Sequence, residues 1–293
     1  MVSRPFIRNG LARAMYDKIM FDNEQRNSDH SHWYEVNKSM IPAEVCDRFI
    51  QFNEDSDTEK FLENCYEKSD WIFTQFFHLI VKSILGFFLT KTSINGFLGR
   101  GSMFVYSSAQ FLEFLSVSEN FHAEALLDIG AGDGKITEKM DQFFDRVFVT
   151  EISQPMISRL ESKRYTVLNA YDWFDEEKKY DVITCLNVLD RCDKPATLLS
   201  QLKQSLKPNG RLIIALVLPF KPFVEAGFGH RPSEFLRLEG KTFEDQLTFL
   251  SQVFFPNMGF KVHAVSKVPY LCEGGLDTSF YVIEDALFLL SAI

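Results

Sequence analysis

Hydrophobic and polar positions follow a regular rhythm in the second half of the chain. From residue 125 onward, short apolar runs alternate with amphipathic stretches, as expected for strands and helices joined in β-α-β units. The predicted strands span 125–129, 146–150, 165–168, 180–186 and 211–218, and the predicted helices span 135–143, 155–163 and 196–206. The pattern predicts an α/β fold with a mostly parallel sheet.

The C-terminal part departs from this rhythm. Residues 262–267 and 280–283 have the pattern of strands, with a long loop and no helix between them. This indicates an antiparallel hairpin at the edge of the sheet. Seven strands ending in such a hairpin are typical of the Rossmann-like class I methyltransferase sheet, whereas a dinucleotide oxidoreductase more often continues with parallel strands.

The first 120 residues have a different organisation. Residues 1–60 are polar and predict an irregular N-terminal extension, with an acidic run at 53–57 that caps a following helix. Residues 61–120 predict a helical segment that packs on or covers the catalytic domain of residues 121–293. The helical segment is thus expected to separate the extension from the catalytic domain.

The most apolar stretch lies at 71–90. Gln75, His78 and Lys82 are spaced three and four residues apart within it, which places them on one helix face. We therefore expect an amphipathic helix that packs on the domain and no integral membrane span.

Composition and charge limit the classes of ligand and substrate that the protein is expected to bind. The net charge of -9 over 293 residues disfavours nucleic acid as the main ligand and suits a neutral or basic substrate. The five cysteines form no Cys-x-x-Cys pair, so we expect no metal site and reduced thiols in an intracellular protein. No apolar leader is visible, and a cytoplasmic location is expected.

A glycine-rich loop carries the strongest chemical signal. The run Asp128-x-Gly130-x-Gly132-x-Gly134 follows an apolar strand and opens a predicted helix. A dinucleotide fingerprint has the spacing Gly-x-Gly-x-x-Gly, and acids at Asp128 and Asp133 would repel a pyrophosphate. They suit the cationic sulfonium of S-adenosyl-L-methionine, whose product after methyl transfer is S-adenosyl-L-homocysteine.

Two further acids complete the predicted cofactor site. Glu151 ends the second strand, near the offset at which an acid accepts hydrogen bonds from ribose hydroxyls. Asp172 follows the third strand, where it could accept from the adenine amino group or be a plain loop acid, and Trp173 could pack on the ring.

The acceptor is expected beyond the fourth strand. Ligands of doubly wound sheets bind at the carboxyl ends of the strands, which is where Asn187 and Asp190 lie. Methyl transfer is an in-line displacement, so the enzyme mainly aligns the acceptor lone pair with the methyl group. Asn187 could orient either partner, or it could only cap the strand while Asp190 and Arg191 form a local ion pair.

Several runs outside the glycine loop resemble one family. They include Leu-Asp-Arg-Cys at 189–192, Pro-Tyr-Leu-Cys-Glu-Gly at 269–274, and the segments 92–96, 99–105, 185–187 and 215–220. From about His32 to the C-terminus the chain resembles the DREV family (methyltransferase-like protein 9), which are protein-histidine N-pros-methyltransferases. The loop after 273–274 is less acidic and less aromatic than this family's pattern.

The resemblance implies methylation of Nδ1 of histidine in His-x-His sequences of protein or peptide substrates. It also implies that Glu151, Asn187 and Tyr270 contact the cofactor, and that Asp190 and Tyr281 face the peptide. It further admits a mitochondrial or endoplasmic reticulum location. On chemical grounds we expect Asp190 to accept from Nε2-H of the acceptor ring and so leave Nδ1 free.

One His-x-His sequence occurs in the chain itself. His30-Ser31-His32 could be two surface histidines by chance, a methylation target, or an occupant of the peptide groove. Two alternatives to histidine methylation also stay open at this point: transfer to a small amine, carboxylate or lipid, and a binding scaffold without turnover.

Overall fold

The computed structural model describes residues 8–71, 74, 94, 98–99, 101–224, 228–275 and 278–293. Most of the amphipathic helix expected at 71–90 lies outside these residues, as does most of the segment 92–102 that follows it. Within them, no helix is both long enough and apolar enough to cross a membrane.

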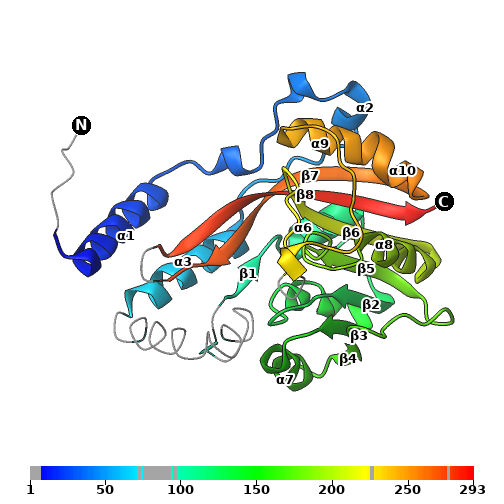
Figure 1. The fold of residues 1–293 in the computed structure, drawn as a ribbon, viewed down its shortest axis with the longest axis horizontal. Coiled ribbons are helices and arrows are strands. Elements are labelled where there is room, and N and C mark those ends of the chain that lie inside the picture. The colour runs from blue at the N-terminus through cyan, green and yellow to red at the C-terminus, as the bar shows by residue number, and fades with distance from the viewer. Residues whose placement is uncertain are drawn as a thin grey trace.

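An eight-stranded sheet forms the centre of the fold, in the order β1-β7-β8-β6-β5-β2-β3-β4 (Figure 1). Strands β2 to β6 pair in parallel, and β7 and β8 form the antiparallel hairpin predicted from the sequence. The strands are β1 (Met103–Phe104), β2 (Ala123–Ile129), β3 (Phe144–Glu151), β4 (Thr166–Asn169), β5 (Tyr180–Leu186), β6 (Leu206–Val217), β7 (Phe260–Glu273) and β8 (Phe280–Ala292). The Rossmann-like methyltransferase architecture is confirmed, with one strand more than expected, because the short β1 pairs with β7.

Helices cover both faces of the sheet. Buried side chains of α2, α8, α9 and α10 form one core with the sheet, and those of α3 and α6 form the other. The helices are α1 (Gly10–Arg26), α2 (Ala43–Cys46), α3 (Ser56–Asp70), α6 (Ser108–Leu115), α7 (Gln154–Ser162), α8 (Pro195–Gln204), α9 (Phe243–Phe249) and α10 (Phe255–Asn257), with a π-helical turn at Leu250–Phe254. Phenylalanines fill much of these cores, and Phe111, Phe255 and Phe288 are fully buried.

Two local expectations were wrong. The helix expected at 135–143 is replaced by two 3-10 turns, Thr137–Lys139 and Asp141–Phe143. Tertiary contacts hold this segment, since Thr137 bonds to Asp128 and Met140 is fully buried. The polar N-terminal extension is also not irregular, because it contains α1 and two 3-10 turns, Ser31–Trp33 and Lys38–Met40.

The N-terminal segment is tied to the sheet. Trp33 and Tyr34 are buried in the same core as Phe280 of β8, and Ile50 N-H donates to Val265 O of β7. The acidic run acts as predicted, because Asp55 Oδ1 accepts from backbone N-H groups at the start of α3. The extension therefore lies beside the C-terminal hairpin (Figure 1).

Candidate active site

The glycine loop leaves the end of β2 in a backbone conformation that requires glycine. Gly130 has φ +71° and Gly134 has φ +76°, both in the left-handed region. A Cβ at Gly130 would lie 2.7 Å from Val188 Cγ2, and one at Gly134 would lie 2.8 Å from Leu160 Cδ2. The loop thus packs directly against the turn after β5 and against α7.

The Asp128 carboxylate fixes the start of the loop by two hydrogen bonds. Its buried carboxylate accepts from Thr137 Oγ1 at 2.6 Å and from Thr184 Oγ1 at 2.7 Å. Burial raises the pKa of Asp128 to about 6, although the two hydroxyl bonds oppose the shift. Both carboxylate oxygens are engaged within the protein, so this residue braces the loop between β5 and the following turn.

Glu151 is hydrogen-bonded directly to the glycine loop. The Gly132 N-H donates to Glu151 Oε2 at 3.0 Å, and Glu151 Oε1 accepts from the N-H groups of Ile152 (2.8 Å) and Ser153 (2.9 Å). A carboxylate has about four lone-pair positions, which leaves room for a ribose hydroxyl. The glycine cradle and this acid fit S-adenosylmethionine.

In the turn after β4, the side chains that are exposed differ from those expected to bind adenine. Trp173 is 8% exposed and packs in the core, so little of its ring is left for the stacking on adenine expected from the sequence. Asp172 is exposed, and its backbone N-H donates to Asn169 O. Tyr171 is 87% exposed and is the aromatic side chain that this turn presents to solvent.

Asn187 lies directly after β5 in a constrained conformation. Its φ is +56°, and its backbone N-H donates to Ala215 O of β6 at 3.0 Å. Its side-chain Nδ2 donates to Asp285 Oδ2 at 2.6 Å. Burial raises the pKa of Asp285, which is fully buried in β8, to about 8. An acid of the C-terminal hairpin is therefore joined to the carboxyl end of β5.

Asp190 is buried in the same turn. Its Oδ2 accepts from Arg191 Nε at 3.0 Å, and burial raises its pKa while the Arg191 guanidinium opposes the shift. Among the described residues, nothing hydrogen-bonds to Asp190 Oδ1, Asn187 Oδ1 or Asp285 Oδ1, although all three atoms are buried. Buried polar atoms without partners are rare, so this group is suited to a ligand that carries N-H or O-H donors.

Tyr270 closes the cofactor side of the site. Its hydroxyl contacts Met103 Sδ of β1, and burial raises its pKa well above the usual value. With Asp128 and Gly130, both side chains line a cavity of about 20 Å³ against the loop. A cofactor as large as S-adenosylmethionine therefore extends beyond this cavity or displaces Met103.

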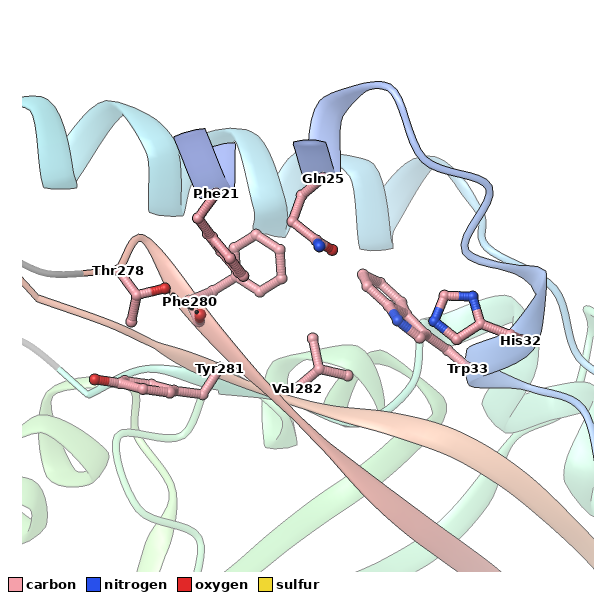
Figure 2. Close-up of a pocket in the computed structure, with 8 residues that line it drawn as sticks. All are labelled: Phe21, Gln25, His32, Trp33, Thr278, Phe280, Tyr281 and Val282. Atoms are coloured by element: carbon pink, nitrogen blue, oxygen red, sulfur yellow. Dashed lines mark hydrogen bonds between the residues drawn. The ribbon is translucent and has the colours of Figure 1, made fainter. Parts of the chain in front are cut away.

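Tyr281 faces a larger groove. It pairs across the hairpin with Cys272, two residues from Tyr270, so the two tyrosines share one face of the hairpin. Figure 2 shows the groove between β8 and the N-terminal extension, with Gln25 of α1 directed into it. The groove measures about 480 Å³ and is lined by Phe21, Gln25, His32, Trp33, Thr278, Phe280, Tyr281 and Val282.

The His-x-His sequence of the chain lies beside this groove. His30 is buried, stacks on Trp33 with ring centroids 3.8 Å apart, and its Nδ1 is 2.8 Å from Glu54 Oε2. His32 is exposed at the groove, with Nδ1 3.1 Å from Asp29 O (Figure 2). Both Nδ1 atoms are thus engaged in local hydrogen bonds.

Sequence reasoning missed Asp285. A signal was present, since Glu284 and Asp285 interrupt an otherwise apolar strand. A buried acid in such a run is unusual and points to a functional role. No group of three or more metal-ligating side chains occurs in the described part of the chain.

Comparison with known proteins identifies the relatives of this chain. The model of the DREV methyltransferase family matches residues 33–292. The mitochondrial ubiquinone biosynthesis O-methyltransferase of Schizosaccharomyces pombe is 30% identical over 108 residues, which are 33% of this chain and 39% of that protein. The corresponding enzyme of Hydrogenovibrio crunogenus is 25% identical over 108 residues, 34% of this chain and 45% of that protein. The chain spans less than half the length of these curated relatives.

Solved structures of low sequence identity also align. The N-methyltransferase NodS from Bradyrhizobium japonicum, in complex with S-adenosylhomocysteine, is 19% identical with a TM-score of 0.41, over 63% of this chain and 85% of that one. The magnesium protoporphyrin IX methyltransferase ChlM from Synechocystis, also with bound S-adenosylhomocysteine, is 14% identical with a TM-score of 0.39, over 63% of this chain and 82% of that one.

Proposed function

Because the chain belongs to the DREV methyltransferase family, we propose that it methylates Nδ1 (the pros nitrogen) of histidine in His-x-His sequences of proteins. Its cofactor is S-adenosylmethionine, which supplies an electrophilic methyl group on a sulfonium. The glycine loop with Gly130, Gly132 and Gly134 would hold this group, and Glu151 would accept from its ribose. Asn187, Asp190 and Tyr270 surround the place where the acceptor would enter.

The buried, unpaired Asp190 Oδ1 is the observation that carries the proposal. Imidazole titrates near pH ~6.5, so a neutral ring already has a nucleophilic lone pair and requires no strong base. If Nε2-H donates to Asp190, the ring is held in the tautomer whose Nδ1 is free to attack. The positive charge that passes to the ring is then stabilised by the carboxylate.

The groove at Tyr281 supports a peptide as substrate. Tyr281, which shares a hairpin face with Tyr270, lies at its edge, while Phe280 and Val282 of the opposite face line it. Gln25 and Thr278 add polar groups to these apolar and aromatic walls. Peptide-binding surfaces combine such aromatic contacts with adaptable polar ones. A small acceptor would need only the buried cluster at Asn187 and Asp190.

Incubation with isotopically labelled cofactor and a panel of His-x-His peptides tests the proposal. We expect one methyl group per acceptor histidine, mapped to Nδ1 by NMR, and no transfer when the acceptor histidine is replaced by alanine. Tight cofactor binding without transfer to any peptide would contradict the proposal and favour a binding scaffold.

O-methylation of a small molecule is a second candidate. It is favoured by the names of the Schizosaccharomyces pombe and Hydrogenovibrio crunogenus relatives, both ubiquinone biosynthesis O-methyltransferases. A hydroxyl acceptor needs a general base, and the raised pKa of Asp285, to about 8, suits that role. Transfer to phenolic hydroxyls, with no methylated histidine in any peptide, would establish this candidate instead.

The chain's own His30-Ser31-His32 is not expected to be a substrate. Nδ1 of His30 is engaged with Glu54 beside the stacked Trp33, and Nδ1 of His32 with Asp29 O, so neither nitrogen is free to attack a methyl group in this arrangement. Intact-protein mass after incubation with the cofactor should be unchanged. A gain of one methyl mass that is lost in His32→Ala would show that the N-terminal segment leaves its place.

A further inference from the structure

Asp285 is an acid in a position that disfavours acids. It is fully buried in β8, where it pairs with Val217 of β6 and Val268 of β7. Among the described residues no cation forms an ion pair with it, and its side chain makes one hydrogen bond, to Asn187. Burying an acid with so little compensation costs folding stability. A purely structural role would be filled better by an apolar side chain.

The hydrogen bond determines how the Asn187 amide is oriented. An amide group has a donor end and an acceptor end, which hydrogen-bond partners distinguish. Because Nδ2 is held by Asp285 Oδ2 at 2.6 Å, Oδ1 is directed away from β8, and this oxygen is buried without a partner. The Asn187 backbone is also held, by its bond to Ala215 O.

The turn that carries Asn187 packs against the cofactor loop. Val188, the next residue, contacts Gly130 so closely that a Cβ there would overlap it. Asp190, three residues after Asn187, also has a buried Oδ1 without a hydrogen-bond partner. Asn187 therefore lies at the carboxyl end of β5, the edge of the sheet at which ligands of such folds bind.

We propose that Asp285 is a positioning residue for methyl transfer, which holds the Asn187 amide with its oxygen toward the acceptor. Without Asp285, the amide can rotate and present its NH₂ group, which cannot accept a hydrogen bond from the acceptor. The inference rests on the proposed function only for the identity of the acceptor. It applies equally to any acceptor that carries an N-H or O-H donor.

Two substitutions separate orientation from charge. Asp285→Asn keeps an oxygen that can accept from Asn187 Nδ2, so we expect kcat close to that of the wild type. Asp285→Val removes the hydrogen bond but suits a buried strand, so we expect kcat to fall about 10- to 100-fold, as for a misplaced catalytic group. The Kd of the cofactor should change little in either variant. Equal losses in both variants would show that an oxygen that accepts from Asn187 Nδ2 is not sufficient, which overturns the positioning role.

The dependence of stability on pH distinguishes a positioning role of Asp285 from a purely structural one. The pKa of Asp285 is raised to about 8 in the folded protein, above its ordinary value of 3.8. The folded state therefore binds the proton more tightly, and stability is lost as pH rises from about 4 to about 8. Asp285→Asn removes this loss, so its Tm should exceed that of the wild type at pH 8 by several degrees. A Tm below that of the wild type at this pH would show that the acid stabilises the fold.

A double-mutant cycle tests whether Asp285 acts through Asn187. In an Asn187→Ala background, Asp285→Val should cause no further loss of kcat, because the group that it positions is gone. Additive losses would overturn the proposal. Glu284→Gln is the matched control for the rate, since this neighbouring acid is exposed and pairs with Lys267 away from Asn187; its kcat should follow the wild type.

NMR of the Asn187 side chain makes the test independent of the acceptor. We expect a distinct, slowly exchanging Asn187 amide pair in the wild type and in Asp285→Asn, and its loss in Asp285→Val. If peptides are not methylated but this pattern is found, the proposed substrate fails and the positioning role stands. An unchanged Asn187 amide signal in Asp285→Val would overturn the positioning role whatever the substrate.

Discussion

Replacing Gly130 by alanine is expected to weaken cofactor binding strongly while the protein stays folded. Alanine at φ +71° is strained, and its Cβ would lie 2.7 Å from Val188 Cγ2. The loop can relieve this overlap only by moving away from the turn after β5, which disturbs its hydrogen bonds to Thr150 and Glu151 and with them the predicted cofactor site. We expect the Kd of S-adenosylmethionine to rise on the order of 100-fold, from the combined cost of strain and overpacking. Titration calorimetry with the cofactor measures it.

Gly229→Ala is the matched control. Gly229 lies outside the glycine loop and has a similar φ of +64°. A Cβ at this position would have nothing within 4 Å. This variant carries the backbone strain without the overlap, so it should lose some stability and bind the cofactor normally. If both variants bind equally well, the close contact between loop and turn is not required for the cofactor site.

Asp190→Asn should show the largest loss in the chemical step. The buried carboxylate is expected to accept from Nε2-H of the acceptor and to stabilise the positive charge that develops on the ring. An amide oxygen can still accept, but it carries no charge, so we expect kcat to fall about 10²- to 10³-fold, as for other lost electrostatic contacts in active sites. Cofactor affinity should be unchanged, and some methyl groups should appear on Nε2, because the ring is no longer held in one tautomer.

Asp193→Asn is the corresponding control in the same turn. Asp193 is exposed and bonds to Ser233, so the same change of charge should leave the rate and the product unaltered. Because burial raises the pKa of Asp190, the activity should also fall as pH is lowered and this carboxylate is protonated. A variant Asp190→Asn that kept both its rate and its nitrogen selectivity would exclude this role.

Local and periodic signals predicted much of the catalytic fold. The strand β5 has the predicted bounds, since it is a short apolar element between clear breaks. The hairpin of β7 and β8 was expected from the absence of a helix between two strand patterns, although both strands are longer than predicted. Such features depend on hydrophobic periodicity, which a single chain displays directly.

Tertiary contacts decided the elements that were missed. Helix α1 has a polar sequence with little amphipathic pattern, and residues of its C-terminal half, such as Lys18, bond to α3. The short β1 is recognisable only from its pairing with β7. Trp173 was expected at the cofactor because aromatic rings stack on adenine, but it is buried in the core, where hydrophobic burial is the stronger effect.

The sequence by itself determined the reaction class, because a glycine loop after a strand, followed by an acid, has few chemical uses. It also placed Asn187 and Asp190 at the end of β5, since strand order and direction follow from the β-α-β rhythm. Only the tertiary structure joined Asp285 to Asn187, a pair separated by 98 positions along the chain. Such contacts leave no periodic trace in the sequence, because antiparallel pairing of β8 with β6 brings the two residues together. The orientation of the Asn187 amide, and with it the acceptor side of the site, is therefore a property of the folded sheet.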